Sequence, residues 1–226
     1  MSRSNDSCAC CRVDPVHPAE LAAVVAAVGA LFGSAELLRR RGVSTHTTRR
    51  YTHATGGMIA AVLPAVLSLG EYVGLALVVA AVLAWTRARG LIASVHGVER
   101  PTLGATLFPL GLAIAAILSW SHPAAYGLGV MTFALADPAA ATVGERIGSP
   151  RWTVWRGTKS IAGSLTFVGV ALVIGLVASL WAPLGLLGVG AVALTLGAIE
   201  GLFGFGLDNL VLPPIAVLAW RAVGAD

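Results

Sequence analysis

The sequence predicts an all-α fold, a polytopic transmembrane helical bundle of about eight helices, some of them interrupted. Hydrophobic residues make up 57% of the chain and charged residues only 12%, whereas soluble domains carry about 25% charged residues. The mean hydropathy is +0.83. Several of the apolar segments are shorter than the ~20 residues that a straight span needs, so interrupted helices are expected. The segments are 19–38, 55–69, 71–86, 104–120, 123–143, 161–181, 183–203 and 207–222.

Residues 17–226 are predicted to form a single transmembrane domain, because the loops between the apolar segments leave no room for a soluble one. Residues 1–16 are predicted to be a mobile N-terminal tail, which lacks the apolar region of a signal peptide. Cys8, Cys10 and Cys11 in this tail could bind a metal or carry lipid groups. No second set of metal ligands accompanies them, so a plain tail is the preferred interpretation.

The positive charges predict how the chain is oriented in the membrane. If the first helix runs from outside to inside, every Lys and Arg except Arg3, Arg12 and Arg221 falls in a cytoplasmic loop. Cytoplasmic loops of membrane proteins carry such an excess, so the basic pI of 9.4 reflects topology and not nucleic-acid binding. We expect a multi-pass protein of a prokaryotic cell membrane, with both termini outside.

The stretch 134–167 contains the strongest functional signal. It begins as apolar chain with one carboxylate, Asp137, and an acid at membrane depth costs a few kcal/mol and indicates a functional site. The polar segment that follows contains glycines and cations: Gly144, Gly148, Gly157, Arg146, Arg151, Arg156 and Lys159. Such residues suit phosphate groups, because they offer free N–H groups, close backbone approach and positive charge. The stretch predicts a membrane-embedded nucleotide or phosphate site with a metal. The alternative is a structural acceptor beside a cytoplasmic anchor.

Two helix starts are expected within this stretch. Asp is a good N-cap and Pro suits the first helical position, so Asp137-Pro138 predicts a break and a new half-helix inside the membrane. The free N–H groups of such half-helices attract anions. The sixth apolar segment is predicted to begin at Ser160, directly after Lys159, with Gly163 in its first turn.

A second polar stretch precedes the second apolar segment, R-R-Y-T-H at 49–53. Arg49 and His53 are four residues apart and share a helix face with Gly57. Arginine can bind a phosphate with two hydrogen bonds, and histidine can exchange a proton at neutral pH. Taken alone, the stretch is better interpreted as a membrane anchor with an interfacial histidine.

Three further polar residues near the C-terminus, Glu200, Asp208 and Asn209, stand in apolar surroundings among Gly201, Gly204 and Gly206. The glycines predict a helix break or close packing. With Asp137, the three side chains supply hard oxygen ligands that suit Mg²⁺ bridged to phosphates.

Four motifs in series between Arg49 and Pro213 resemble those of the phytol, farnesol and dolichol kinases, membrane enzymes that use CTP to phosphorylate isoprenoid alcohols. The motifs are R-R-Y-T-H, A-D-P-A-A-A-T-V-G-E-R-I-G, T-K-S-I-A-G-S-L-T-F and E-(x7)-D-N-(x3)-P. The chain departs from the family pattern at three positions. Arg50 replaces the usual Lys, Ala136 replaces the Gly before Asp137, and Ala162 replaces a Glu.

The resemblance implies a kinase-like domain whose site lies at the cytoplasmic face and holds CTP and Mg²⁺. We hypothesise that the catalytic residues are Asp137, His53 and Lys159, with Asp137 or His53 accepting the proton of the alcohol. The metal ligands would be Asp137, Asp208, Asn209 and Glu200. The nucleotide and phosphate groups would be bound by Arg49, Arg50, Arg156, Lys159, Ser160, Gly144, Gly148 and Gly163.

Two other functions remain open at this point. A cytidylyltransferase similar to CDP-diacylglycerol synthase belongs to the same superfamily, but its G-H-G-G and D-R-x-D signature is missing here. A proton- or cation-coupled transporter would be expected to contain inverted repeats, and none is visible. The expected partners are a lipid alcohol, CTP and membrane lipids, with no nucleic acid. The oligomeric state stays open.

Overall fold

The computed structural model describes residues 18–97 and 102–225, so the predicted tail with its three cysteines lies outside the described residues. These residues form a helical bundle with one two-stranded sheet. The elements are α1 (Pro18–Arg40), α2 (Thr45–Val62), a 3₁₀ turn (Leu63–Ala65), α3 (Leu69–Ala88), α4 (Ala93–His96), α5 (Gly104–Ser119), α6 (Pro123–Arg146), β1 (Arg151–Val154), β2 (Gly157–Ser160), α7 (Ile161–Ala178), α8 (Leu186–Leu202) and α9 (Asp208–Ala222).

Four of the helices, α1, α3, α6 and α7, are long and apolar enough to cross a membrane. The helices α5 and α8 are apolar but shorter. Large apolar side chains such as Val78, Leu165 and Leu187 are exposed on the outside of the bundle. Exposed apolar surface of this extent is typical of a protein that contacts lipid. The predicted transmembrane helical bundle is confirmed.

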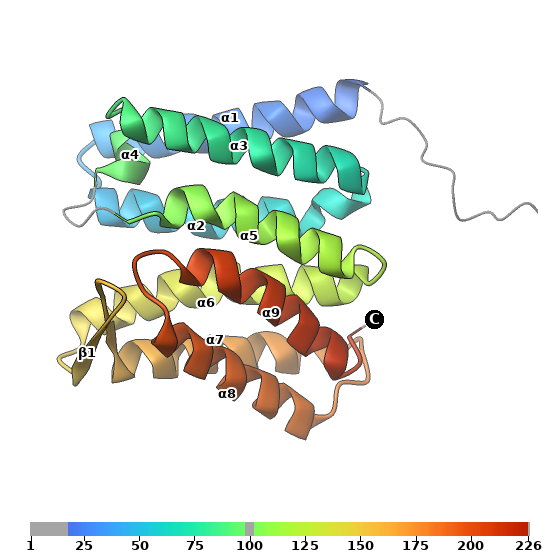
Figure 1. The fold of residues 1–226 in the computed structure, drawn as a ribbon. Helices are drawn as coiled ribbons and strands as arrows, with labels where there is room; N and C mark the ends of the chain where they lie inside the picture. Colours follow the sequence, from blue (N-terminus) through green and yellow to red (C-terminus); the bar gives the residue numbers. More distant parts are fainter. Residues whose placement is uncertain (1–17, 98–101, 226) are drawn as a thin grey trace, which may run out of the picture.

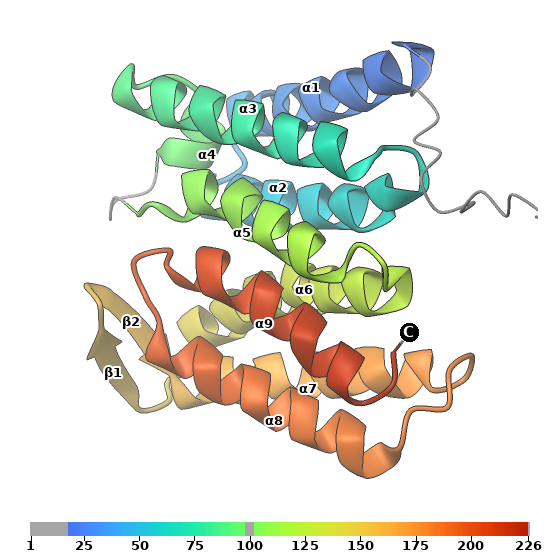
Figure 2. The same ribbon diagram turned by 45° about the vertical axis from the view of Figure 1, so that its right-hand side comes forward.

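The helix α6 lies at the centre of the bundle, where it packs against α2, α7 and α9 (Figures 1 and 2). The helix α5 connects the part of the bundle that contains α3 with the part that contains α9, because it packs on both helices. One buried cluster includes Phe133, Phe167 and Trp220, and a second includes Tyr72 and Tyr126. Residues of α2 and α9 can therefore face residues of α6.

Small residues allow these helices to approach closely. A Cβ on Gly57 of α2 would overlap Ala134 of α6, and a Cβ on Gly129 of α6 would lie 2.6 Å from the backbone nitrogen of Val217 on α9. Helices in membranes pack through such small residues, because lipid supplies no hydrophobic drive for association. The glycines therefore bring α2, α6 and α9 together around one space.

The second helix begins about ten residues earlier than the apolar segment predicted at 55–69. Ser44 caps it by accepting a hydrogen bond from the Thr47 N–H at 3.2 Å. Its first turns are polar, and hydropathy alone does not detect them. Arg49 and His53 therefore lie on one helix, as their spacing indicated.

The break predicted at Asp137-Pro138 is wrong, because α6 is continuous from Pro123 to Arg146. Proline removes one backbone donor, but packed membrane helices tolerate this loss when neighbouring groups satisfy the backbone. The carbonyl left without its helical donor is that of Ala134, and the helix continues on both sides of the proline. Asp137 therefore projects from the middle of an intact helix, without the free N–H groups of a helix start.

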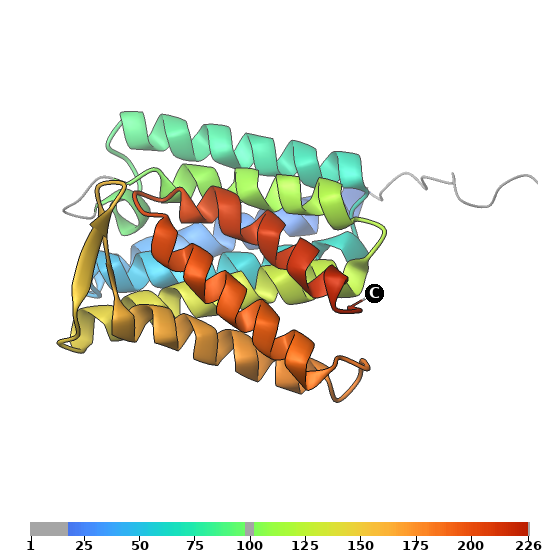
Figure 3. The same cartoon turned by 60° about the horizontal axis from the view of Figure 1, so that its bottom comes forward.

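The polar segment after α6 forms a β-hairpin that the sequence analysis did not predict. In its antiparallel register Lys159 lies opposite Trp152. The turn residues Trp155 and Arg156 have φ angles of 45° and 60°, and two successive positive φ angles are typical of the type I′ turn that suits the twist of a hairpin. Figure 3 shows the hairpin across one end of the bundle, with its tip beside the loop between α8 and α9.

This end of the bundle, which we call the hairpin end, also contains α4, the last residues of α1, α3 and α6 and the start of α2 (Figure 1). The described cations other than Arg221 lie on the hairpin, early in α2, in the last turns of α1, α3 and α6, or directly after α1 and α3. The start of α1 and the C-terminus lie at the opposite end (Figure 1). The described Lys and Arg residues other than Arg221 thus lie at one end of the bundle, as expected if the loops that carry them are on one side of the membrane.

Candidate active site

A cavity of about 730 Å³ opens among α1, α2, α3, α5, α6, the hairpin and the loop between α8 and α9. At the hairpin end its wall is polar and contains the arginines, acids and lysine identified in the sequence. Deeper in the bundle the wall is apolar. The cavity is therefore divided into a charged half and an apolar half.

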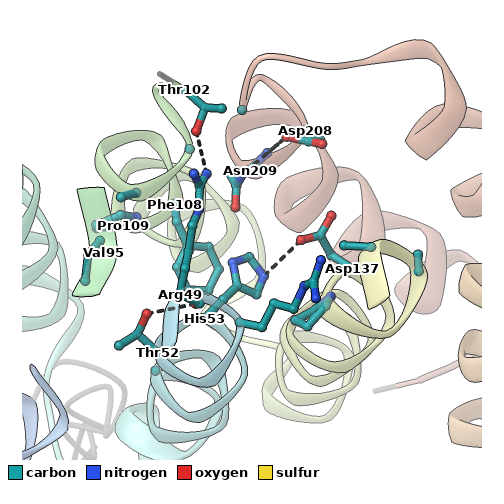
Figure 4. Close-up of a pocket in the computed structure, with 18 of the residues that line it drawn as sticks. Arg49, Thr52, His53, Val95, Thr102, Phe108, Pro109, Asp137, Asp208 and Asn209 are labelled. Atoms are coloured by element: carbon teal, nitrogen blue, oxygen red, sulfur yellow. Dashed lines mark hydrogen bonds and ion pairs between the residues drawn. The ribbon is translucent and has the colours of Figure 1, made fainter. Parts of the chain in front are cut away.

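Between the two halves, His53 of α2 faces Asp137 of α6 (Figure 4). The His53 Nε2 lies 3.8 Å from the Asp137 Oδ2. Phe108 stacks on the imidazole at 4.3 Å, and Phe133 meets it edge-on at 5.0 Å. The His53 Nε2 is buried and has no hydrogen-bond partner. Because buried polar atoms are normally paired, this nitrogen is a candidate for contact with a ligand.

The two arginines of α2 reach different parts of the charged half. Arg49 donates a hydrogen bond to the hydroxyl of Thr102, a residue in the segment just before α5 (Figure 4). Arg50 forms a close ion pair with Glu145 near the end of α6, and the His46 Nδ1 lies 3.8 Å from the same carboxylate. Arg49 is therefore positioned within the cavity wall, whereas Arg50 also joins α2 to α6.

Lys159, on β2, lies between two carboxylates from other elements. Its Nζ is 2.6 Å from the Glu200 Oε1 and 2.9 Å from the Asp208 Oδ2. The Ser164 hydroxyl donates to the second Glu200 oxygen at 2.8 Å. Burial alone would lower the pKa of Lys159, but Asp208 and Glu200 outweigh that effect and raise its pKa above the usual value. The lysine is therefore a fixed positive charge in the cavity wall.

The start of α9 supplies the remaining polar groups. The Asp208 Oδ1 accepts hydrogen bonds from the backbone and side-chain N–H groups of Asn209, both at 3.1 Å. The Asn209 Oδ1 is buried and has no partner. No group of three or more His, Cys, Asp or Glu side chains in residues 18–97 and 102–225 is arranged to hold a metal. A metal here would need ligands from a substrate as well as from the protein.

Ser160 starts α7, as predicted, and its hydroxyl accepts a hydrogen bond from the Gly163 N–H at 3.1 Å. Gly144 lies against this cap, since a Cβ there would lie 2.5 Å from the Ser160 Oγ. All of these residues line the cavity. Gly148 does not line it, and a Cβ on Gly148 would meet open space. The structure therefore brings every predicted site residue except Gly148 to one cavity.

Thr102, Glu145 and Phe205 are among the lining residues that were not recognised in the sequence. The Arg156 guanidinium lies 5.9 Å from the centre of the Phe205 ring. Phe205 has a φ of 59°, a conformation that is strained for an aromatic residue. The glycines at 201, 204 and 206 predicted a helix break here, where α8 ends and α9 begins, but no sequence signal singled out Phe205.

Comparison with known proteins points to one family. No protein-family model matches the chain, and no solved structure matches it. The chain is 31% identical over 203 residues to the phytol kinase of Synechocystis sp., an alignment that covers 85% of this chain and 87% of the relative. The relative belongs to the group of kinases that the four sequence motifs resembled. The protein belongs to the phytol kinase family.

Proposed function

We propose that the protein is a membrane-embedded kinase that transfers the γ-phosphoryl group of CTP to the hydroxyl of an isoprenoid alcohol. The observation that carries the proposal is the divided cavity, with cations and acids in one half and apolar walls in the other. An amphipathic alcohol and a nucleotide phosphate need these two environments side by side. The relative's name, phytol kinase, supports the substrate class.

The charged half suits a triphosphate. Phosphoryl transfer depends mainly on charge neutralisation and in-line positioning of the reacting groups. Lys159 and Arg156 come from the hairpin and Arg49 comes from α2, so the cations approach a phosphate from two sides. Arg50 and the backbone around Ser160 add to this wall.

The residues present also fit a magnesium ion. Mg²⁺ in kinases is held by one or two carboxylates together with substrate phosphates and water. Asp137 and the Asn209 Oδ1, which has no hydrogen-bond partner, are available for this role. Both oxygens of Glu200 and both oxygens of Asp208 already accept hydrogen bonds, so we assign these two carboxylates to holding Lys159 and not to the metal. When bound, the ion would neutralise phosphate charge.

In the reaction, the alcohol oxygen forms a bond to the γ-phosphorus as the bond from that phosphorus to the CDP oxygen breaks. The proton of the alcohol passes to the His53–Asp137 pair, which lies where the two halves of the cavity meet. The aromatic rings around His53 limit access of water to this point.

The proposal is tested with the purified full-length protein in lipid vesicles, supplied with Mg²⁺, γ-labelled CTP and phytol, farnesol or a polyprenol. We expect labelled lipid phosphate and CDP, with less product when ATP, GTP or UTP replaces CTP. Release of pyrophosphate with transfer of the cytidylyl group would instead identify a cytidylyltransferase. Solute flux without nucleotide turnover would identify a transporter.

The His53–Asp137 pair is tested with His53→Gln and Asp137→Asn variants in the same assay. Loss of general-base catalysis costs about 10²–10⁴-fold in rate, so we expect kcat to fall by that factor in at least one of them. Glu71→Gln, in the capping box of α3 and away from the cavity, is the control. Wild-type kcat in both site variants would remove the pair from its role.

A further inference from the structure

The apolar half of the cavity follows α2 away from His53 toward Leu63. Ten residues of helix separate these positions, which corresponds to about 15 Å. The wall is formed by side chains of α1, α2, α3 and α5. Representative lining residues are Leu31, Ile59, Leu75, Val79 and Leu112. The apolar half belongs to the same cavity as the charged half. It therefore begins beside the reacting groups and extends away from them along α2.

Tyr72 lines the far part of this half, and Tyr126 packs behind it. Tyr72 of α3 lines the cavity, and its hydroxyl accepts a hydrogen bond from the Tyr126 hydroxyl at 2.6 Å. The Tyr126 hydroxyl also approaches the Ala60 carbonyl of α2 at 3.3 Å. Tyr72 is 2% exposed and Tyr126 is 1% exposed. The ring of Trp120 packs on Tyr72 at 5.7 Å. Because the tyrosine hydroxyls are paired and the rings are packed, this floor is rigid.

We infer that the apolar half binds the isoprenoid tail of the alcohol and that Tyr72 limits the length of tail that the enzyme accepts. The inference rests on the proposed kinase function and extends it to a specificity-determining residue. A tail that starts at a hydroxyl beside His53 meets apolar walls along α2, in the direction of the tyrosine floor. Tails longer than this half would have to displace Tyr72 or leave the cavity.

Ala76 allows the cavity to be shortened. It lies one turn from Tyr72 on the same face of α3, is 8% exposed and lines the cavity. In Ala76→Leu the larger side chain occupies space near the floor. A difference of one methylene in an apolar pocket changes kcat/KM by about 10–200-fold. We therefore expect the kcat/KM ratio of phytol to geraniol, a shorter alcohol, to fall at least ~10-fold.

Ala81→Leu is the matched control, because Ala81 is on the same helix, is exposed and does not line the cavity. It adds the same atoms on a surface that would face lipid. The ratio of phytol to geraniol should equal that of the wild type in this variant.

The complementary variant lengthens the cavity. Tyr72→Leu removes the ring that lines the far part, so we expect polyprenols longer than phytol to gain kcat/KM relative to geraniol by about 10-fold. A gain of activity cannot come from misfolding. Tyr72→Leu therefore tests the tail assignment even if Ala76→Leu loses activity because it folds poorly.

The outcomes separate the inference from the proposed function. If the wild-type protein phosphorylates no alcohol, the kinase proposal fails. If the wild type is active but Ala76→Leu and Tyr72→Leu leave the length profile unchanged, the tail assignment is overturned. Equal loss for alcohols of every length in Ala76→Leu, with no gain in Tyr72→Leu, would also overturn it.

Discussion

At the scale of single residues, the arrangement of Lys159 explains why three charged groups are tolerated inside an apolar bundle. Its ammonium group contacts Glu200 and Asp208, whose side chains are 5% and 10% exposed. A buried ion pair contributes little net stability, but removing one partner leaves an uncompensated charge, which is strongly unfavourable. Ser164 further satisfies Glu200. Lys159 is therefore a structural partner of both carboxylates, and under the proposed function it is also a cation for phosphate.

Replacement of this lysine is expected to separate the two roles. Lys159→Met leaves Glu200 and Asp208 without their partner and should reduce the free energy of unfolding by about 3 kcal/mol. Adding Glu200→Gln should restore part of the stability, because one uncompensated charge is removed, but should not restore kinase activity. Thermal unfolding in detergent and the CTP assay measure the two effects. Full activity in the double variant would contradict the phosphate role.

The pH dependence of this contribution follows from the raised pKa of Lys159. Because the pKa in the folded state lies above that in the unfolded state, the stabilisation is fully present below the unfolded value of about 10.4 and is lost as pH rises through the folded pKa. The stability difference between wild type and Lys159→Met should therefore be constant from neutral pH to about pH 10. A difference that declines already between pH 7 and 9 would be inconsistent with this arrangement.

At the scale of elements, the hairpin and α6 decide where the site residues lie. The hairpin carries Lys159 across the hairpin end, and Trp152 fixes it to α8 by donating to the Gly201 carbonyl at 3.0 Å. Gly157 and Gly204 allow the hairpin to contact the loop between α8 and α9, since a Cβ on Gly157 would lie 3.1 Å from the Gly204 Cα. Asp137 comes from a continuous helix and not from a helix start.

The two glycines that flank the end of α6 should respond differently to the same substitution. Gly144→Ala places a methyl group against the Ser160 cap, so we expect a stability loss of about 1–3 kcal/mol from overpacking and reduced activity. Gly148→Ala points into open space and should leave both properties close to wild type. Unfolding midpoints and kcat/KM for phytol provide the comparison. Equal effects at the two positions would show that this packing account is wrong.

At the scale of the whole molecule, the described cations other than Arg221 gather at the hairpin end, and the charged half of the cavity lies at the same end. Cytoplasmic loops of membrane proteins are rich in Lys and Arg, so the hairpin end is expected to face the cytoplasm, where CTP is available. The opposite end contains the start of α1, the loop between α7 and α8 and the C-terminus (Figure 1).

This orientation is testable by cysteine labelling after Cys8, Cys10 and Cys11 are replaced by serine. Trp155→Cys places a thiol at the hairpin tip, and Trp181→Cys places one after α7, at positions that are 61% and 80% exposed. A membrane-impermeant maleimide should label position 181 in intact cells, and position 155 only after permeabilisation. The reverse pattern would place the site on the outer face.

Composition and local pattern were sufficient for the class of the fold and for selecting polar residues that the structure brings to one cavity. Hydropathy identified the apolar helices, because burial in lipid requires long apolar runs. An ionisable residue inside such a run costs free energy and indicates a functional site by default. This cost drew attention to Asp137, Glu200 and Asp208. The Ser160 cap was also predictable, since capping is a local interaction.

Only the tertiary structure decided the remaining features, because they depend on contacts between segments far apart in the chain. Local signals at Asp137-Pro138 favoured a helix start, but packing of α6 against its neighbours keeps the helix continuous. The sequence could not tell that Lys159 bonds to Glu200, or that Gly148 lies away from the cavity. The sequence by itself determined which polar residues the membrane would have to accommodate. The packing of helices determined which of them share one cavity, since that depends on distances across the bundle that no local pattern encodes.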